Sequence, residues 1–193
     1  MLKEIVKECR PAMVLLAAFT LITGVIYPVA VTAVGGAVFS SKAGGSLINR
    51  DGNVVGSSLI AQKFTGERYF WARPSAADYN AASSSGSNLA PSNPALADAV
   101  KARVADMRTS DSLNHAPIPP DLALTSASGL DPDISIDGAN WQAARVARVR
   151  GIPEVRIREL VEANTHRRAL GVLGEPAVNV LVLNIALDDL AKK

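Results

Sequence analysis

An uncharged apolar stretch near the N-terminus constrains this chain more than any other feature. No Asp, Glu, Lys or Arg occurs between Arg10 and Lys42, and apolar residues dominate the segment from Pro11 to Phe39. A helix over residues 11–39 would be roughly 43 Å long, whereas the hydrocarbon core of a bilayer is about 30 Å thick. A lone span must satisfy its peptide groups internally and is therefore helical. We predict a transmembrane helix over residues 11–39.

Two other kinds of N-terminal segment share some of these features. A cleaved secretory signal has an apolar region of about 7–15 residues, and this stretch is about twice as long, although Val31-Thr32-Ala33 resembles a small-residue cleavage site. A lipoprotein needs its cysteine after the apolar run, and the only cysteine, Cys9, precedes it. A retained anchor explains the sequence better than either alternative.

The flanking charges predict the orientation of this helix. Lys3, Lys7 and Arg10 lie on its short N-terminal side, while Lys42 and Arg50 begin a long domain. Basic residues in short segments stay in the cytoplasm, whereas long domains are translocated largely regardless of charge. We predict a single-pass protein of the inner membrane, with residues 1–10 as a cytoplasmic N-terminus and residues 40–193 as a periplasmic domain.

Glycine and proline interrupt the aliphatic character of the predicted span. Pro28 removes a backbone donor and predicts a kink near Gly24. Gly24, Gly35 and Gly36 would let another helix approach closely, so we predict that they contact a partner subunit. The alternative is that Gly and Pro are simply commoner in membrane helices.

The remaining residues predict one mixed domain. About 150 residues suffice for a single core, and a lone cysteine excludes an internal disulfide. We predict an α+β fold, because helical and strand patterns are mixed without regular βαβ spacing. The aromatic run at 68–71 is expected in the core or as an interface anchor, and not as a ligand platform. The expected elements are a hairpin at 46–55 around Asp51-Gly52, a strand or helix at 58–64, strands at 122–125 and 178–183, and helices at 94–108, 135–149, from Pro153 onward and at 184–190.

The residues that could carry chemistry are sparse. The sequence has no GxxxxGK[ST] phosphate loop, and neither His115 nor His166 has a second ligand at metal spacing. A serine between Ser83 and Ser92 could use His115 as base and Asp121 or Asp131 to orient it, but no Gly-x-Ser-x-Gly elbow supports a hydrolase. We predict no catalytic residue, no metal site and no nucleic-acid partner. A set of arginines is expected on solvated, ion-paired helix faces: Arg145, Arg148, Arg150, Arg156, Arg158, Arg167 and Arg168.

Three long motifs resemble one known family. They are Arg73-Pro74-Ser75-Ala76 with Tyr79-Asn80 and the run from Ser84 to Pro94; Ser128-Gly129-Leu130-Asp131-Pro132 with Ile134-Ser135; and Leu173-Gly174-Glu175-Pro176 continuing through Val178 to Asp188. In this order, and with the N-terminal span, they resemble the C-subunit (KdpC) family of the bacterial Kdp potassium-transporting P-type ATPase. The resemblance covers essentially the whole chain.

The resemblance implies a non-catalytic accessory subunit of an ATP-driven potassium uptake complex. In that family a channel-like subunit binds potassium and a P-type subunit hydrolyses ATP, and the C subunit assists assembly and raises the ATP affinity of the catalytic subunit. It implies no cofactor of its own, since ATP and potassium act in the assembled complex, and membrane lipid surrounds the span. The competing class is a stand-alone anchored periplasmic hydrolase or ligand-binding protein, which predicts a deep site with convergent polar groups.

The resemblance also has departures and an open site. Family members usually have glycine where Ser85, Ala90 and Ala127 stand, and often histidine at Asp133; a side chain at a position of positive φ would be strained. The polar loop from Ser84 to Asn93 is expected to contact the potassium-binding subunit, through Asn88 and Asn93. The alternative is that Asn93 is a helix N-cap and Asn88 a turn residue.

Overall fold

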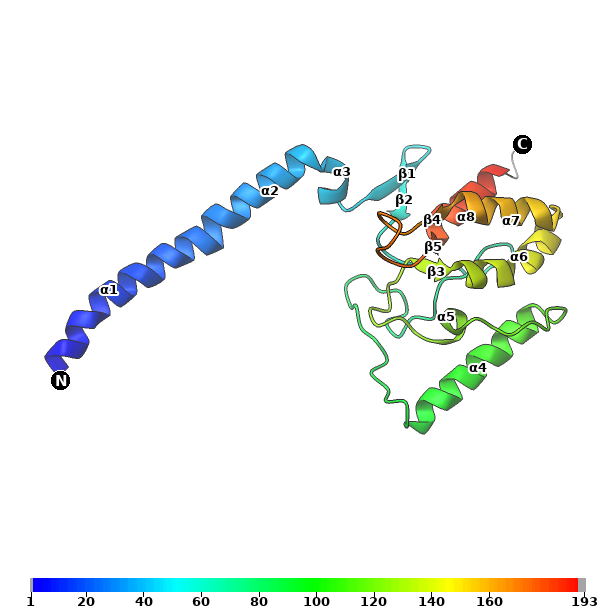
Figure 1. Cartoon of the computed structure of the whole chain (residues 1–193), viewed down its shortest axis with the longest axis horizontal. Coiled ribbons are helices and arrows are strands. Elements are labelled where there is room, and N and C mark those ends of the chain that lie inside the picture. The colour runs from blue at the N-terminus through cyan, green and yellow to red at the C-terminus, as the bar shows by residue number, and fades with distance from the viewer. Residues whose placement is uncertain (1, 191–193) are drawn as a thin grey trace. The chain divides into compact units, whose positions relative to one another are not determined.

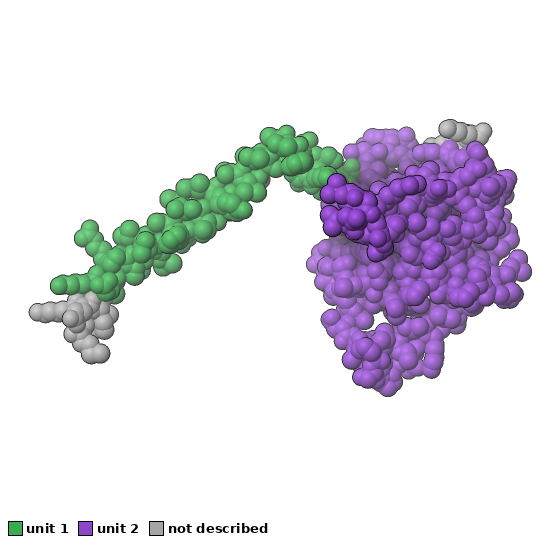
Figure 2. Space-filling model, viewed as in Figure 1, with its two compact units in different colours: residues 1–47 green, residues 48–193 purple. Residues whose placement is uncertain are grey.

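The computed structural model describes residues 2–190 of the chain, and the side chains of residues 7–190. The predictions of topology and domain extent also used Met1, residues 191–193 and the side chain of Lys3. These lie outside the described residues. The chain divides into two compact units, residues 1–47 and residues 48–193 (Figure 2). Each unit is described by itself.

The first unit is one long helix with a local irregularity. It consists of α1 (Leu2–Leu21), a π-helical turn η1 (Ile22–Ile26), α2 (Tyr27–Val38) and a short α3 (Ser40–Ala43) (Figure 1). Within it, Lys7–Val38 is a 32-residue stretch long and apolar enough to cross a membrane. The helix therefore begins before Pro11, at which we expected it to start.

The π-helical turn lies where the sequence predicted a disturbance. Proline lacks the N–H that would bond to the carbonyl four residues earlier, and its ring crowds that carbonyl. For Pro28 that carbonyl belongs to Gly24, in the middle of η1. One extra residue in the turn accommodates the proline, and such π-bulges are a known form of helix irregularity.

The second unit opens with the expected hairpin and then runs irregularly. Strands β1 (Leu47–Arg50) and β2 (Asn53–Ser57) pair with each other. Asp51 and Gly52 both have positive φ, at 50° and 80°, which is the conformation of a type I′ turn. Residues 58–64, which we expected to be strand or helix, form neither.

A small antiparallel sheet and four longer helices form most of the rest of the domain. The sheet has the order β3 (Asp133–Ser135), β5 (Ala177–Asn179), β4 (Thr165–His166), with Val178 opposite both Ile134 and Thr165. The longer helices are α4 (Pro94–Ser110), α6 (Ile136–Arg150), α7 (Glu154–Ala163) and α8 (Val180–Leu190); α6 packs on α7, and α7 on α8 (Figure 1). This is the predicted α+β domain.

One predicted strand is wrong, and another is shorter than predicted. Residues 122–125 overlap a short helix, α5 (Pro120–Ala123), because Pro120 stands at its first turn, where proline is favoured. The apolar run 178–183 is strand only to Asn179 and then becomes α8. Asn179 Oδ1 accepts a hydrogen bond from Val182 N at 3.1 Å, which is the contact of a helix N-cap.

The core lies between the sheet and the helices. Phe70, Ile134, Ile157, Val178 and Leu183 are all fully buried. Of the aromatic run, Phe70 lies in the core and the partly buried Trp71 packs against it, which confirms the core alternative for these two rings. On α7, Ile157 and Val161 form the predicted buried face.

Candidate functional site

The first two sequence motifs are hydrogen-bonded to each other. Ser75 Oγ donates to Gly129 O at 2.6 Å and accepts from Ala77 N and Tyr79 N at 3.1 and 2.9 Å. Arg73 pairs with Asp131 through Nη1 and Oδ2, 2.9 Å apart. One serine and one ion pair thereby fix the segment that begins at Arg73 against the turn at Gly129.

The polar loop that follows lies on the same turn. Ser84 Oγ donates to Ser128 O at 2.9 Å. A Cβ added to Gly86 would stand 2.8 Å from Ala127 O, and one added to Gly129 would stand 2.6 Å from Ser85 O. Glycine is thus required on both sides, because the two backbones approach too closely for any side chain.

The third motif joins the other two through the sheet. Strand β3 follows the turn directly, and it pairs with β5 of the third motif. In addition, Val180 N donates to Pro132 O at 2.9 Å, and Asn179 Nδ2 donates to Ser58 O at 2.8 Å. The motifs that carried the resemblance are far apart in sequence and form one connected structure.

The loop residues expected to bind a partner are on the surface of this structure. Asn88 and Asn93 are both exposed. Asn88 has φ 53°, a left-handed conformation that asparagine tolerates, and Asn93 Oδ1 accepts from Ala95 N at 3.0 Å as the N-cap of α4. Both local roles are therefore present, and partner contact by these residues stays a prediction.

The departures at Ser85, Ala90 and Ala127 do not strain the backbone. The residues with positive φ in the described part of the chain include none of the three. Asp133 is different in kind: its Oδ1 is buried without a hydrogen-bond partner, and burial, reinforced by the nearby charge of Asp131, raises the pKa of this carboxyl.

We expect Asn93→Ala to lower the free energy of unfolding by about 1 kcal/mol, because it removes the N-cap of α4. Asn93→Ser should restore stability, because serine caps equally well but lacks the amide. Urea unfolding of the full chain in detergent measures both. If Asn93→Ser is stable and the assembled complex is still lost, Asn93 contacts a partner; if the complex is also restored, capping is its whole role.

The residues of the hydrolase alternative are engaged elsewhere. Asp121 Oδ2 accepts from Ser135 N at 2.7 Å, and Asp131 pairs with Arg73. His115 and Ser84 line different surface hollows. The structure does not bring these groups together as a catalytic set, and among the residues it describes no group of three or more His, Cys, Asp or Glu could hold a metal ion.

The predicted solvated arginine face is wrong for Arg145. This side chain is 0% exposed. Its guanidinium donates to Glu67 O, to Tyr69 O at 3.1 Å and to Gln142 Oε1 at 2.8 Å, and it lies 4.1 Å from the centre of the Trp71 ring. Burial lowers the pKa of Arg145 to about 10, which leaves it protonated at neutral pH.

Two buried amides complete the contacts that Arg145 makes with the aromatic segment. Gln142 accepts from Trp71 N at 2.8 Å and donates to Trp71 O at 3.1 Å. Asn184 does the same for Phe70, with both distances 2.9 Å. The side chains of α6 and α8 thus hydrogen-bond this extended segment as a neighbouring strand would.

Arg150 is ion-paired as predicted but is not solvated, and the other arginines fit the prediction better. Arg148 pairs with the buried Asp111 at 2.8 Å, and Arg150, whose side chain is 3% exposed, pairs with Asp188 at 2.7 Å. Arg156, Arg158 and Arg168 form exposed ion pairs with glutamates. These last pairs are solvated, as expected, and add little stability.

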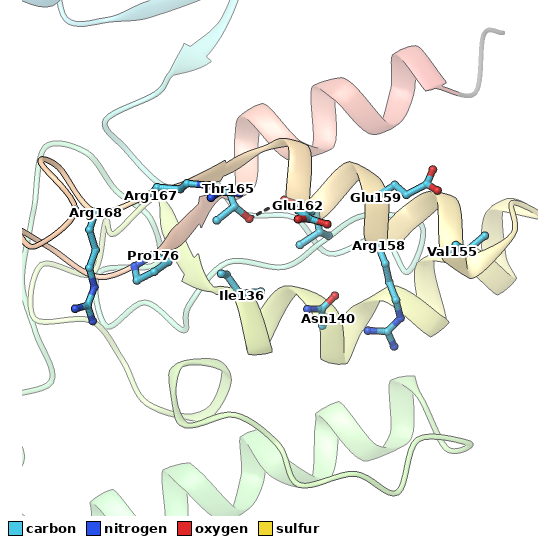
Figure 3. A pocket seen from close by; sticks show the side chains of 12 residues that line it. Ile136, Asn140, Val155, Arg158, Glu159, Glu162, Thr165, Arg167, Arg168 and Pro176 are labelled. Atoms are coloured by element: carbon cyan, nitrogen blue, oxygen red, sulfur yellow. Dashed lines mark hydrogen bonds between the residues drawn. The ribbon is translucent and has the colours of Figure 1, made fainter.

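One hollow of the domain lies between α6, α7 and the loop after β4 (Figure 3). Its volume is about 790 Å³, and Ile136, Val155, Val161 and Pro176 supply apolar lining. Arg158 and Arg168 lie toward opposite ends, and Thr165 is turned to the backbone of Val161 (Figure 3). None of its lining residues is a serine, cysteine or histidine, and its one hydroxyl, Thr165 Oγ1, donates to Val161 O at 2.8 Å.

Comparison with known proteins decides the family. The family model described as "K+-transporting ATPase, c chain" (KdpC) matches residues 9–189. The chain belongs to the KdpC family. KdpC subunits of potassium-transporting ATPases from Methylorubrum extorquens and Polaromonas naphthalenivorans are 53% and 56% identical to it; the first alignment covers 96% of this chain and 98% of the relative, and the second covers 94% of each. The KdpC subunit of Ralstonia nicotianae is 54% identical, over 94% of this chain and 90% of its own.

Family membership places the observed structure in context. The KdpC match includes the long apolar helix together with the domain, which fits a single-pass membrane subunit of a transport ATPase. Sequence reasoning missed the structural role of Arg145, Gln142 and Asn184, which bind backbone atoms far away in the chain. The pairing of Gln142 and Arg145 three residues apart on one helix is the only local signal they leave.

Proposed function

We propose that this chain is a non-catalytic accessory subunit of an ATP-driven, high-affinity potassium uptake complex. It assists assembly of a potassium-binding, channel-like subunit with a catalytic P-type subunit, and it raises the ATP affinity of the catalytic subunit. The helix crosses the inner membrane with the N-terminus in the cytoplasm, and the domain lies in the periplasm. ATP and potassium act in the assembled complex.

The observation that carries this proposal is the extent of the KdpC match. It runs from residue 9 to residue 189, through span and domain alike, and the named relatives are subunits of potassium-transporting ATPases. The three motifs support a binding role, because their polar side chains hold backbone segments together and present an exposed loop. Preorganised loops bind partners with little ordering cost.

The carboxylates of the domain also support a non-catalytic role. A P-type reaction needs a phosphate cradle and a carboxylate set for magnesium. Here Asp121 accepts a hydrogen bond from Ser135 N at the start of α6, Asp131 binds Arg73, and Asp188 binds Arg150. These carboxylates are occupied in holding the fold.

A periplasmic domain would act on cytoplasmic ATP only through the membrane subunits. The effect is then a coupling free energy between two sites, typically about 1–3 kcal/mol, or about 5–150-fold in affinity. Potassium-stimulated ATPase activity of the complex with and without this chain tests it: omission should raise the KM for ATP within that range. An unchanged KM contradicts the proposal, and saturable ATP binding by the isolated full chain would replace indirect coupling with direct nucleotide contact.

We expect Gly35→Leu and Gly36→Leu to reduce the yield of intact complex. No atom outside each glycine's own helix backbone lies within 4 Å of a Cβ added there, so leucine does not disturb the chain itself. Ala30→Leu is the matched control, because at 3.6 residues per turn it lies about 140° and 120° from the two glycines on α2. Co-purification with the other subunits measures the effect. Equal yields from all three variants would show that α2 is only an anchor.

A further inference from the structure

The loop between β4 and β5 exposes aliphatic side chains at its tip. Leu170 is 91% exposed, Val172 72% and Leu173 60%. The tip is not loose backbone, because Ala169 and Leu173 exchange hydrogen bonds of 2.8 and 2.9 Å and Gly171 N donates to Arg168 O at 3.1 Å. The fold thus holds three apolar side chains in water.

Leu170 also has a strained backbone. Its φ is 53°, a left-handed conformation that is unusual for a bulky residue other than glycine or asparagine. Glycine follows it at 171 with φ 77°. A leucine that gains no burial and adopts an unfavourable conformation does not serve folding, and such outliers concentrate at functional positions.

The base of the loop is cationic. Arg167 and Arg168 directly precede the tip, and no acidic residue occurs between them and Glu175. Arg168 pairs with Glu175 at 2.6 Å in an exposed contact, and Arg167 has no ion pair among the residues whose side chains are described. Figure 3 shows both arginines at the same end of the hollow, beside the loop.

We propose that residues 167–173 form a second membrane contact, in which the aliphatic tip enters the bilayer surface and the two arginines bind lipid phosphate. The order of cationic base and apolar tip matches the order of headgroup and acyl chain. A protein interface uses about 20–30 residues a side, of which this tip would supply only a small part. A membrane contact needs less, because the span tethers the domain: residues 39–46 extend at most about 28 Å, which keeps the effective concentration of lipid high.

Site-specific fluorescence in vesicles tests this proposal on the full chain. Val172→Cys in a Cys9→Ser background carries one NBD label, since Cys9 is the only native cysteine; Leu113→Cys, at a position 70% exposed in the same domain, is the matched control. In vesicles containing phosphatidylglycerol, NBD at 172 should emit at shorter wavelength and be quenched by lipids doxyl-labelled near the headgroup, while NBD at 113 should not. Identical behaviour at both positions overturns the proposal.

Further variants separate lipid from protein contact and from folding. The double variant Arg167→Gln, Arg168→Gln should remove the dependence of quenching at position 172 on phosphatidylglycerol. Leu170→Gly should raise the thermal midpoint, by relieving the left-handed strain, and yet reduce quenching at 172. If the signal at 172 instead changes only when the other subunits are present, the loop binds a protein surface and the lipid proposal is wrong.

Discussion

Arg145→Met is expected to destabilise the domain by about 3–5 kcal/mol. Methionine fills similar space but removes the donor from Gln142 Oε1, in a buried contact, and from the carbonyls of Glu67 and Tyr69, in part-buried contacts. Each buried group left without its donor costs about 1–3 kcal/mol. The substitution also removes the cation from the face of the Trp71 ring. Because domains are stable by only about 5–15 kcal/mol, this loss is a large fraction of the whole. Urea unfolding of the full chain in detergent, followed by circular dichroism, measures it.

Arg156→Met is the control for this substitution. Arg156 pairs with Glu159 at 3.2 Å, with side chains 59% and 57% exposed, so its loss should change the unfolding free energy by no more than about 0.5 kcal/mol. Arg145→Lys should rescue little, because an ammonium lacks the planar fork that reaches several acceptors at once. If Arg145→Met is as mild as Arg156→Met, the buried contacts do not stabilise the domain.

Gly129→Ala is expected to lower the unfolding free energy by about 3 kcal/mol or more, from strain and steric conflict together. Gly129 has φ +66°, and a Cβ would stand 2.6 Å from the backbone oxygen of Ser85. The polar loop would have to move off the turn, which separates the first two motifs. The loss of complex formation should therefore accompany the loss of stability.

Gly151→Ala isolates the contribution of backbone conformation. Gly151 has nearly the same φ, +67°, but nothing lies within 4 Å of an added Cβ. We expect a loss of about 1–2 kcal/mol from the left-handed conformation alone. The difference in unfolding free energy between the two variants measures the steric cost of placing a Cβ between the loop and the turn. Equal losses would mean that the loop can move away from the added Cβ at no measurable cost in stability.

Local chemistry made much of the fold predictable. The Asp51-Gly52 turn, the caps at Asn93 and Ser135 and the left-handed end at Gly151 all act within a few residues, and all are present. The strand predicted at 178–183 was too long, because a short apolar run is compatible with strand and helix alike. The N-cap geometry of Asn179, which resolves the choice, was the overlooked signal.

The candidate site was less predictable because its contacts span long stretches of chain. Arg145 reaches carbonyls 76 and 78 residues away, and Asn184 reaches Phe70 across 114 residues. No local pattern separates such an arginine from Arg156 on an exposed face. The family resemblance identified the motifs at residues 73–94 and 128–135, but only the structure shows that they are joined at Ser75 and Gly129.

The π-helical turn changes which residues of α1 and α2 share one face of the long helix. An extra residue in one turn rotates everything beyond it by about 100° relative to an uninterrupted α-helix. A helical wheel drawn straight through Ile22–Ile26 therefore assigns residues of α1 to the wrong side relative to those of α2. If a neighbouring helix packs on Gly35 and Gly36, it faces a different side of α1 from the one that an uninterrupted helical wheel predicts. Residue pairs for crosslinking must therefore be chosen separately for α1 and for α2.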